Sequence, residues 1–297
     1  MTTIAERVGG APISWGVCEA PGWGHELPAD LVLLQMRELG LRATELGPTG
    51  YLGSEPAEVR ERLGRQGLRL IGGFLPVPMH ISTESDLNEA TAAIRTLVAA
   101  GADVVVFAAR SADGSYDRKV PLDDDEWAHL LATLRQLQQI ATEHGLTPTL
   151  HPHVGTAIED RAAVLRLLDS SDVRLCLDTG HLLIGGMDPL ELVRLAADRV
   201  AHVHLKDVRK SVAAAVSAGD TSYLKAVRAG LYTPLGDGAL DVAAIVQSLE
   251  DAGYRGWYVL EQDAALSGPP EPGAGPIQDV RRSIEFLSRV AFTEAAR

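Results

Sequence analysis

The sequence is poor in cysteine and in positive charge. Its two cysteines, Cys18 and Cys176, form no CxxC pair, which disfavours a zinc-finger or dithiol redox protein. With 27 Lys and Arg against 40 Asp and Glu, the formal net charge is −13, and such a surface repels a phosphate backbone. We therefore expect no nucleic-acid partner, and a DNA-repair nuclease is disfavoured.

Membrane and nucleotide-binding signatures are lacking as well. No apolar run approaches the roughly 20 residues that a membrane-spanning helix needs. The N-terminus MTTIAERVGG lacks a charged-then-apolar signal pattern, so we expect a cytoplasmic protein with no membrane partner. The segment APISWGVCEAPGWG contains no GxGxxG fingerprint, which disfavours a doubly wound nucleotide-binding sheet.

Eight short β-rich or apolar runs recur along the chain and alternate with amphipathic stretches of helical spacing. The predicted strands are residues 10–15, 42–47, 68–74, 103–108, 147–153, 173–181, 199–206 and 256–262. Predicted helices between them include 29–40, 56–67, 87–101, 124–145 and 188–199, and glycines fall where four of these should end: Gly40, Gly67, Gly101 and Gly145. Eight alternating units predict a single α/β domain over residues 1–297, a (β/α)8 TIM barrel.

Two segments interrupt the repeat of strands and helices. Residues 208–241 form an insertion between the seventh and eighth predicted strands. Because the loops that follow barrel strands surround the catalytic mouth, we expect this insertion beside the active site, as a lid. Residues 267–276, SGPPEPGAGP, predict an irregular loop, since proline and glycine suit no element interior.

Polar residues gather at the predicted strand ends, where this fold builds its active sites. Residues i and i+2 of a strand face the same way, so His151, Asp178, His204 and Glu261 can meet. Two imidazoles with two carboxylates suit Mn²⁺, Co²⁺, Fe²⁺ or Zn²⁺ better than Mg²⁺. Other polar residues at these ends are Glu45, His153, His181, His202, Lys206 and Asp263.

Structural interpretations of the same residues stay open. The acidic side chains could form a buried ion-pair network with Lys206 or Arg209, although we rank metal binding first for Asp178 and Glu261. Glu45 could cap a helix. For Glu45, His153 and His181, a direct role and a supporting role that orients a metal ligand fit the sequence about equally well.

Seven motifs, spread over nearly the whole chain, carry a family resemblance. They are APISW (11–15), TELG (44–47), HPHVGT (151–156), LDTGH (177–181), HVHLKD (202–207), YTPLGDGALD (232–241) and GWYVLE (256–261). The chain resembles the inosose dehydratase (2-keto-myo-inositol dehydratase) branch of the xylose isomerase-like, or sugar phosphate isomerase/epimerase, TIM barrel superfamily. One departure stands out, because isomerases of the superfamily usually carry Glu where this chain has His151.

The resemblance implies one metal ligand from each of four adjacent strands, at His151, Asp178, His204 and Glu261. The implied cofactor is a divalent ion, with Mn²⁺ or Co²⁺ ahead of Zn²⁺ and Fe²⁺. The implied activity is that of a hydro-lyase of myo-inositol catabolism that dehydrates an inosose. A keto-sugar isomerase or epimerase that uses the same enediolate is the alternative, followed by a carbohydrate-binding barrel without catalysis.

Further side chains complete this hypothesis. We expect Glu45 or His181 to remove the proton beside the ketone, and Lys206 to assist the departing hydroxyl or the enolate oxygen. We expect the polyol ketone to contact three more side chains: Trp15, His153 and Arg209. Phe74 fits ordinary core packing better than a substrate contact, and a homodimer is compatible with the sequence.

Overall fold

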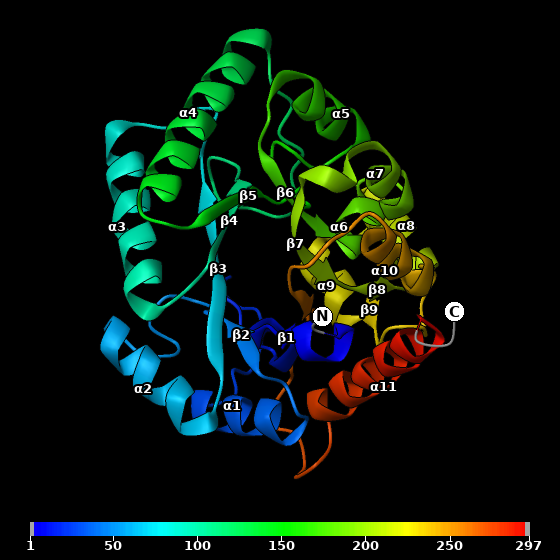
Figure 1. The fold of residues 1–297 in the computed structure, drawn as a ribbon. Helices are drawn as coiled ribbons and strands as arrows, with labels where there is room; N and C mark the ends of the chain where they lie inside the picture. The colour runs from blue at the N-terminus through cyan, green and yellow to red at the C-terminus, as the bar shows by residue number, and fades with distance from the viewer. Residues whose placement is uncertain (1–2, 295–297) are drawn as a thin grey trace.

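The computed structural model describes residues 3–294, in which eight parallel strands close into a barrel surrounded by helices (Figure 1). The order around the barrel is β1, β10, β7, β6, β5, β4, β3, β2, so the predicted TIM barrel is confirmed. The barrel strands are β1 (Val8–Gly10), β2 (Ala43–Glu45), β3 (Arg69–Val77), β4 (Val104–Ala109), β5 (Thr147–Leu150), β6 (Arg174–Asp178), β7 (Val200–Leu205) and β10 (Tyr258–Leu260).

Amphipathic helices surround the barrel, and their apolar faces join the barrel strands in one main core. The glycines predicted to end helices have left-handed φ angles of +82°, +67°, +95° and +85°, which confirms these caps. No helix in the described part of the chain is long and apolar enough to cross a membrane. The helices are α1 (Ala29–Glu38), α2 (Pro56–Gln66), α3 (Glu84–Ala100), α4 (Asp124–Glu143), α5 (Arg161–Ser170), α6 (Thr179–Ile184), α7 (Pro189–Ala196), α10 (Val242–Asp251) and α11 (Pro276–Glu294).

The first strand lies earlier than the sequence predicts. The expected strand covers residues 10–15, whereas β1 ends at Gly10 and Pro12–Trp15 forms the 3-10 helix η2. Pro12 starts this turn because its fixed φ suits a first helical position and it has no N–H for the sheet.

Strands five and six end earlier than predicted as well. The chain leaves β5 after Leu150, and Asp178 ends β6 and caps α6.

The insertion folds into two helices, α8 (Lys210–Ser217) and α9 (Tyr223–Arg228), and a short antiparallel pair, β8 (Asp207–Val208) with β9 (Tyr232–Thr233). The Asp207 carboxylate holds the returning chain, accepting the N–H groups of Gly236, Gly238 and Leu240 at 3.0 Å each. A Cβ on Gly238 would lie 2.2 Å from that carboxylate, so the turn requires glycine there. The loop at 267–276 is irregular up to the start of α11, as predicted.

Candidate metal centre

The four predicted metal ligands converge at the mouth of the barrel. His151, Asp178, His204 and Glu261 each offer one donor atom, and these atoms lie within 4.8 Å of one another. They sit at the ends of four consecutive strands, β5, β6, β7 and β10. Asp178 Oδ2 lies 3.5 Å from His151 Nε2 and 3.7 Å from His204 Nδ1, and His204 Nδ1 lies 2.6 Å from Glu261 Oε2.

Three of these donor atoms are buried without a hydrogen-bond partner among residues 3–294: Asp178 Oδ2, His204 Nδ1 and Glu261 Oε2. Buried polar atoms are normally hydrogen-bonded, whereas these three atoms have only ion-pair contacts, with one another and with Lys206 Nζ, which lies 3.3 Å from Glu261 Oε2 and 3.5 Å from Asp178 Oδ2. A cation among the three atoms would satisfy all of them. The donor set of two nitrogens and two oxygens therefore fits a divalent transition metal.

Hydrogen bonds fix which nitrogen of each ligand histidine faces the centre. His151 Nδ1 donates to the Pro152 carbonyl at 2.7 Å, which leaves the Nε2 lone pair for a metal. His204 Nε2 donates to Glu45 Oε1 at 3.0 Å, which leaves Nδ1. A carbonyl or carboxylate behind a ligand histidine is typical of metal sites, because it fixes the tautomer and the ring orientation.

Glu45 supports the centre from inside the barrel. Its Oε1 accepts hydrogen bonds from His202 Nε2 at 2.7 Å and from His204 Nε2. Burial alone would raise the pKa of Glu45, but the two histidines hold it well below its usual value. This geometry favours the supporting role over proton abstraction and over helix capping, because Oε1 is engaged by two imidazoles, one of which is a candidate metal ligand.

His153 and His181 stack beside the centre with ring centroids 3.7 Å apart. His153 Nδ1 donates to the Val154 carbonyl at 2.7 Å, and the ring lines the cavity described below. His181 lies behind it, where Nδ1 accepts the Val154 N–H at 3.4 Å and Nε2 lies 3.3 Å from Lys206 Nζ. Burial lowers the pKa of both rings well below the usual value, which favours their neutral forms. Of the two rings, only His153 lines the cavity, so it has the better access to a ligand.

Lys206 lies among three carboxylates. Its Nζ is 2.5 Å from Asp263 Oδ1, 3.3 Å from Glu261 Oε2 and 3.5 Å from Asp178 Oδ2. Burial alone would lower the pKa of Lys206, but these carboxylates raise it well above its usual value. The ion-pair network considered from the sequence therefore exists, and it adjoins the cluster of ligands instead of replacing it.

A cavity of about 230 Å³ opens over the candidate centre. Phe74 lies in its wall, with its ring centroid 5.7 Å from that of His153, and it also packs against a small buried cluster that includes Val106 and Cys176, as expected. Its lining combines polar and aromatic side chains, as in many small-molecule sites. Polar lining residues include Glu45, His151, His153, Lys206, Glu261 and Asp263, and the aromatic ones are Trp23, Phe74, Tyr116 and Tyr223.

Two predicted substrate contacts lie outside this cavity. Trp15 is fully buried in the main core, where its Nε1 donates to Gln35 Oε1 at 2.7 Å, because η2 turns it away from the barrel mouth. Arg209 occupies the N-cap position of α8 without a side-chain capping bond, is exposed and lies against Gly230 of the insertion. Both expectations are corrected. Tyr116, Tyr223 and Trp23 were missed because they come from loops and from α9, where no strand-end pattern marks them.

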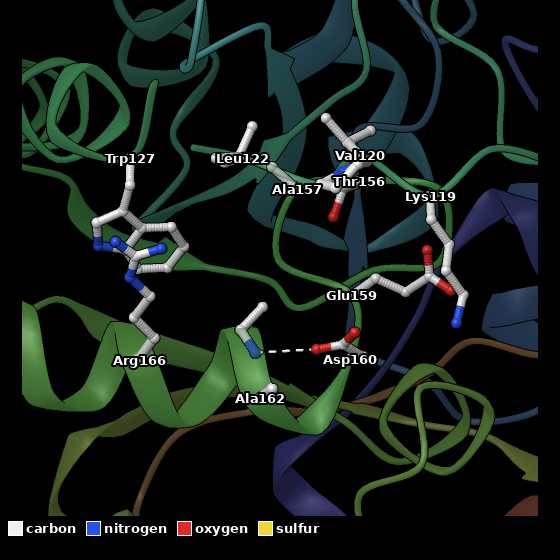
Figure 2. Close-up of a pocket in the computed structure, with 12 residues that line it drawn as sticks. Lys119, Val120, Leu122, Trp127, Thr156, Ala157, Glu159, Asp160, Ala162 and Arg166 are labelled. Atoms are coloured by element: carbon white, nitrogen blue, oxygen red, sulfur yellow. Dashed lines mark hydrogen bonds between the residues drawn. The ribbon is translucent and has the colours of Figure 1, made fainter. Parts of the chain in front are cut away.

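A separate groove of about 270 Å³ lies outside the barrel, between the starts of α4 and α5 (Figure 2). Trp127 and Arg166 face each other across one end of it, with the guanidinium carbon 4.4 Å from the ring centroid. Its lining residues differ throughout from those of the cavity over the ligand cluster. The groove therefore belongs to the outer surface and not to the candidate centre.

Comparisons with known proteins agree with this arrangement over nearly the whole chain. Residues 33–290 match the family model of the xylose isomerase-like TIM barrel. An inosose dehydratase of Geobacillus kaustophilus (strain HTA426) is 35% identical over 280 residues, covering 89% of this chain and 90% of that protein. The rhizopine catabolism protein MocC of Rhizobium meliloti is 33% identical over 296 residues, covering 96% of this chain and 89% of that protein. The crystal structure of the IolI protein with a bound zinc atom has the same fold, with a TM-score of 0.69 and 15% sequence identity. The match covers 96% of this chain and 98% of the IolI chain.

Proposed function

The chain belongs to the xylose isomerase-like TIM barrel family, and from that premise we propose that it is a metal-dependent dehydratase acting on an inosose. Relatives 30–35% identical over most of the chain are inosose dehydratases, which supports the reaction and the substrate class. One observation carries the metal part of the proposal. Three buried donor atoms without hydrogen-bond partners lie close together beside His151 Nε2, and a divalent ion would satisfy them.

The metal would be held by His151, Asp178, His204 and Glu261. When bound there, a divalent ion supplies Lewis acidity toward a ketone oxygen and its neighbouring hydroxyl. Mn²⁺ and Co²⁺ suit the mixed nitrogen and oxygen ligands, followed by Zn²⁺ and Fe²⁺. Zinc belongs in any test, because the IolI protein of the same fold binds it.

His153 is the side chain best placed to take the proton beside the ketone. Its Nδ1–H is engaged by the Val154 carbonyl, so Nε2 keeps its lone pair, and the ring lines the cavity. When the C–H bond breaks, its proton goes to Nε2 and its electrons form a C=C bond to the carbonyl carbon, while the C=O π electrons move to the ketone oxygen and give an enolate. When the C=O bond re-forms, the C=C bond shifts by one carbon and the hydroxyl on the next carbon leaves with its C–O electrons.

Lys206 is placed to assist that departure. Its ammonium lines the same cavity and can give the leaving hydroxide the proton that makes water. The remaining enol tautomerises to a 1,2-dione. Proton exchange with solvent returns His153 to its neutral form and Lys206 to its charged form, so the net change is the loss of one water.

His151 disfavours the isomerase alternative. Epimerisation requires a second base that returns the proton to the ring carbon. At the position where isomerases of the family usually have Glu, His151 donates from Nδ1 to Pro152, and its Nε2 faces the other ligands. Neither nitrogen is free to shuttle a proton once a metal is bound.

We expect the metal-loaded protein to convert an inosose into a product lighter by one water. The test is incubation with a panel of inososes and ketohexoses, with product masses measured by mass spectrometry and metal-stripped protein as the control. Mass separates the candidate functions, because isomers have the mass of the substrate. Products of unchanged mass alone would establish the isomerase instead, and no turnover with any metal would favour a binding barrel.

Lys206→Met is expected to retain the metal and to lower kcat by about 10² to 10⁴-fold, the usual contribution of a positioned acid. The reason is that Nζ lines the cavity without being a ligand of the metal. The measurement is kcat and KM together with elemental analysis. Lys225→Met, an exposed lysine of α9, is the matched control and should behave as wild type. Unchanged kinetics of Lys206→Met would reduce Lys206 to a structural ion pair.

A further inference from the structure

Asp263 lies in the cavity, is 7% exposed, and has no part in the proposed reaction. Both of its carboxylate oxygens are engaged. Oδ1 accepts from Lys206 Nζ at 2.5 Å, and Oδ2 accepts from the Tyr223 hydroxyl at 2.5 Å. The Tyr223 hydroxyl in turn shares a hydrogen bond of 2.8 Å with the Tyr232 hydroxyl. Two tyrosines of the insertion thus lie beside the carboxylate that pairs with Lys206.

The other carboxylates within reach of Lys206 are candidate metal ligands. Glu261 Oε2 lies 3.3 Å from Nζ and Asp178 Oδ2 lies 3.5 Å away, and both atoms are among the donors without a hydrogen-bond partner. An ammonium carries three donors and can approach several oxygens at once. A lysine ammonium and a divalent ion therefore compete for the same two oxygens.

We propose that Asp263 is a positioning residue that holds the Lys206 ammonium away from the metal-binding oxygens, and that Tyr223 locks Asp263 in this place. This inference rests on the metal centre of the proposed function. Without the charge of Asp263, the carboxylates left to Lys206 are Asp178 and Glu261. Shifted toward them, the ammonium neutralises the charge that attracts the metal.

Tyr223 is well fixed for this purpose. Its backbone N–H donates to Asp117 Oδ1 at 2.6 Å, and its ring packs against Trp23 with centroids 6.3 Å apart. The side chain is 2% exposed. The insertion therefore does more than cover the cavity, because it sets the position of the buried cation beside the ligand cluster.

The test compares metal affinity in wild type, Asp263→Asn, Lys206→Met and the double variant, by competition of Co²⁺ with a chromophoric chelator. Asparagine has the shape of aspartate but lacks its charge. We expect Asp263→Asn to bind Co²⁺ about 10- to 100-fold more weakly, the range for groups behind metal ligands. Lys206→Met should bind at least as tightly as wild type, and the double variant should match Lys206→Met, because the competing ammonium is gone. Asp220→Asn, an exposed carboxylate of the insertion, should match wild type.

The affinities of these variants support or overturn the role of Asp263. Wild-type affinity in Asp263→Asn overturns the inference while leaving the metal centre intact. A double variant as weak as Asp263→Asn overturns it too, since the loss would then be independent of the lysine. Tyr223→Phe should weaken binding in the same direction by a smaller factor, and it serves as the readout if Asp263→Asn fails to fold. A wild-type protein that takes up no metal overturns the metal centre itself and the inference with it.

Discussion

Asp178→Ala is expected to be purified without stoichiometric metal and with kcat/KM lowered by on the order of 10³-fold or more. Lewis-acid stabilisation is worth several kcal/mol, and each 1.36 kcal/mol corresponds to a factor of ten. Asp178 has this effect because its Oδ2 faces both imidazoles of the ligand cluster, 3.5 Å from His151 Nε2 and 3.7 Å from His204 Nδ1. Elemental analysis and steady-state kinetics on the same preparations measure both losses.

The control for this variant must account for a second role of Asp178. Its Oδ1 also accepts the His181 N–H at 2.8 Å and caps α6, so alanine removes a helix cap worth about 1 kcal/mol as well. Asp188→Ala removes a similar cap, the bond from Leu190 N–H at 3.0 Å that starts α7, and its side chain lies outside the cavity. That variant should keep metal and turnover. Full metal occupancy in Asp178→Ala would contradict the assigned site.

Much of the barrel could be predicted because its signals are local. Apolar runs that alternate with stretches of helical spacing indicated eight strand-and-helix units. Glycines at the expected helix ends predicted the C-terminal caps, and their positive φ angles confirm them. The convergence of His151, Asp178, His204 and Glu261 followed from one fact about the fold. Parallel strands in a closed barrel all end at the same mouth, so polar residues at consecutive ends must meet.

The sequence predictions failed where contacts between distant parts of the chain determine the position of a side chain. Trp15 sits in a run that reads as strand, but Pro12 starts a 3-10 turn that carries the indole into the core. Glu45 stands at a strand end, yet β2 and β7 are not neighbours in the barrel, so its bonds to His202 and His204 cross the interior. No sequence period reports such a contact. Tyr223 was missed for a related reason, since the path of the insertion is set by packing against Trp23 and Asp117.

His153→Gln is expected to retain the metal and to lower kcat by about 10² to 10⁴-fold, with little change in KM, because glutamine cannot take a proton. The His153 ring lines the cavity and its Nε2 has no metal-ligand role, whereas His181 does not line the cavity and contacts Lys206. His181→Gln should therefore retain more activity than His153→Gln. Kinetics with elemental analysis of both variants measure this difference.

Exchange of the substrate's α-proton in D₂O separates the two halves of the reaction. Proton removal by His153 precedes loss of the hydroxyl, which Lys206 assists. His153→Gln and Lys206→Met should therefore block different steps. His153→Gln should abolish incorporation of deuterium beside the ketone, measured by NMR. Lys206→Met should continue to incorporate deuterium into unreacted inosose while releasing little product. If His153→Gln exchanges the proton as fast as wild type and His181→Gln does not, His181 is the base and His153 only binds the ring.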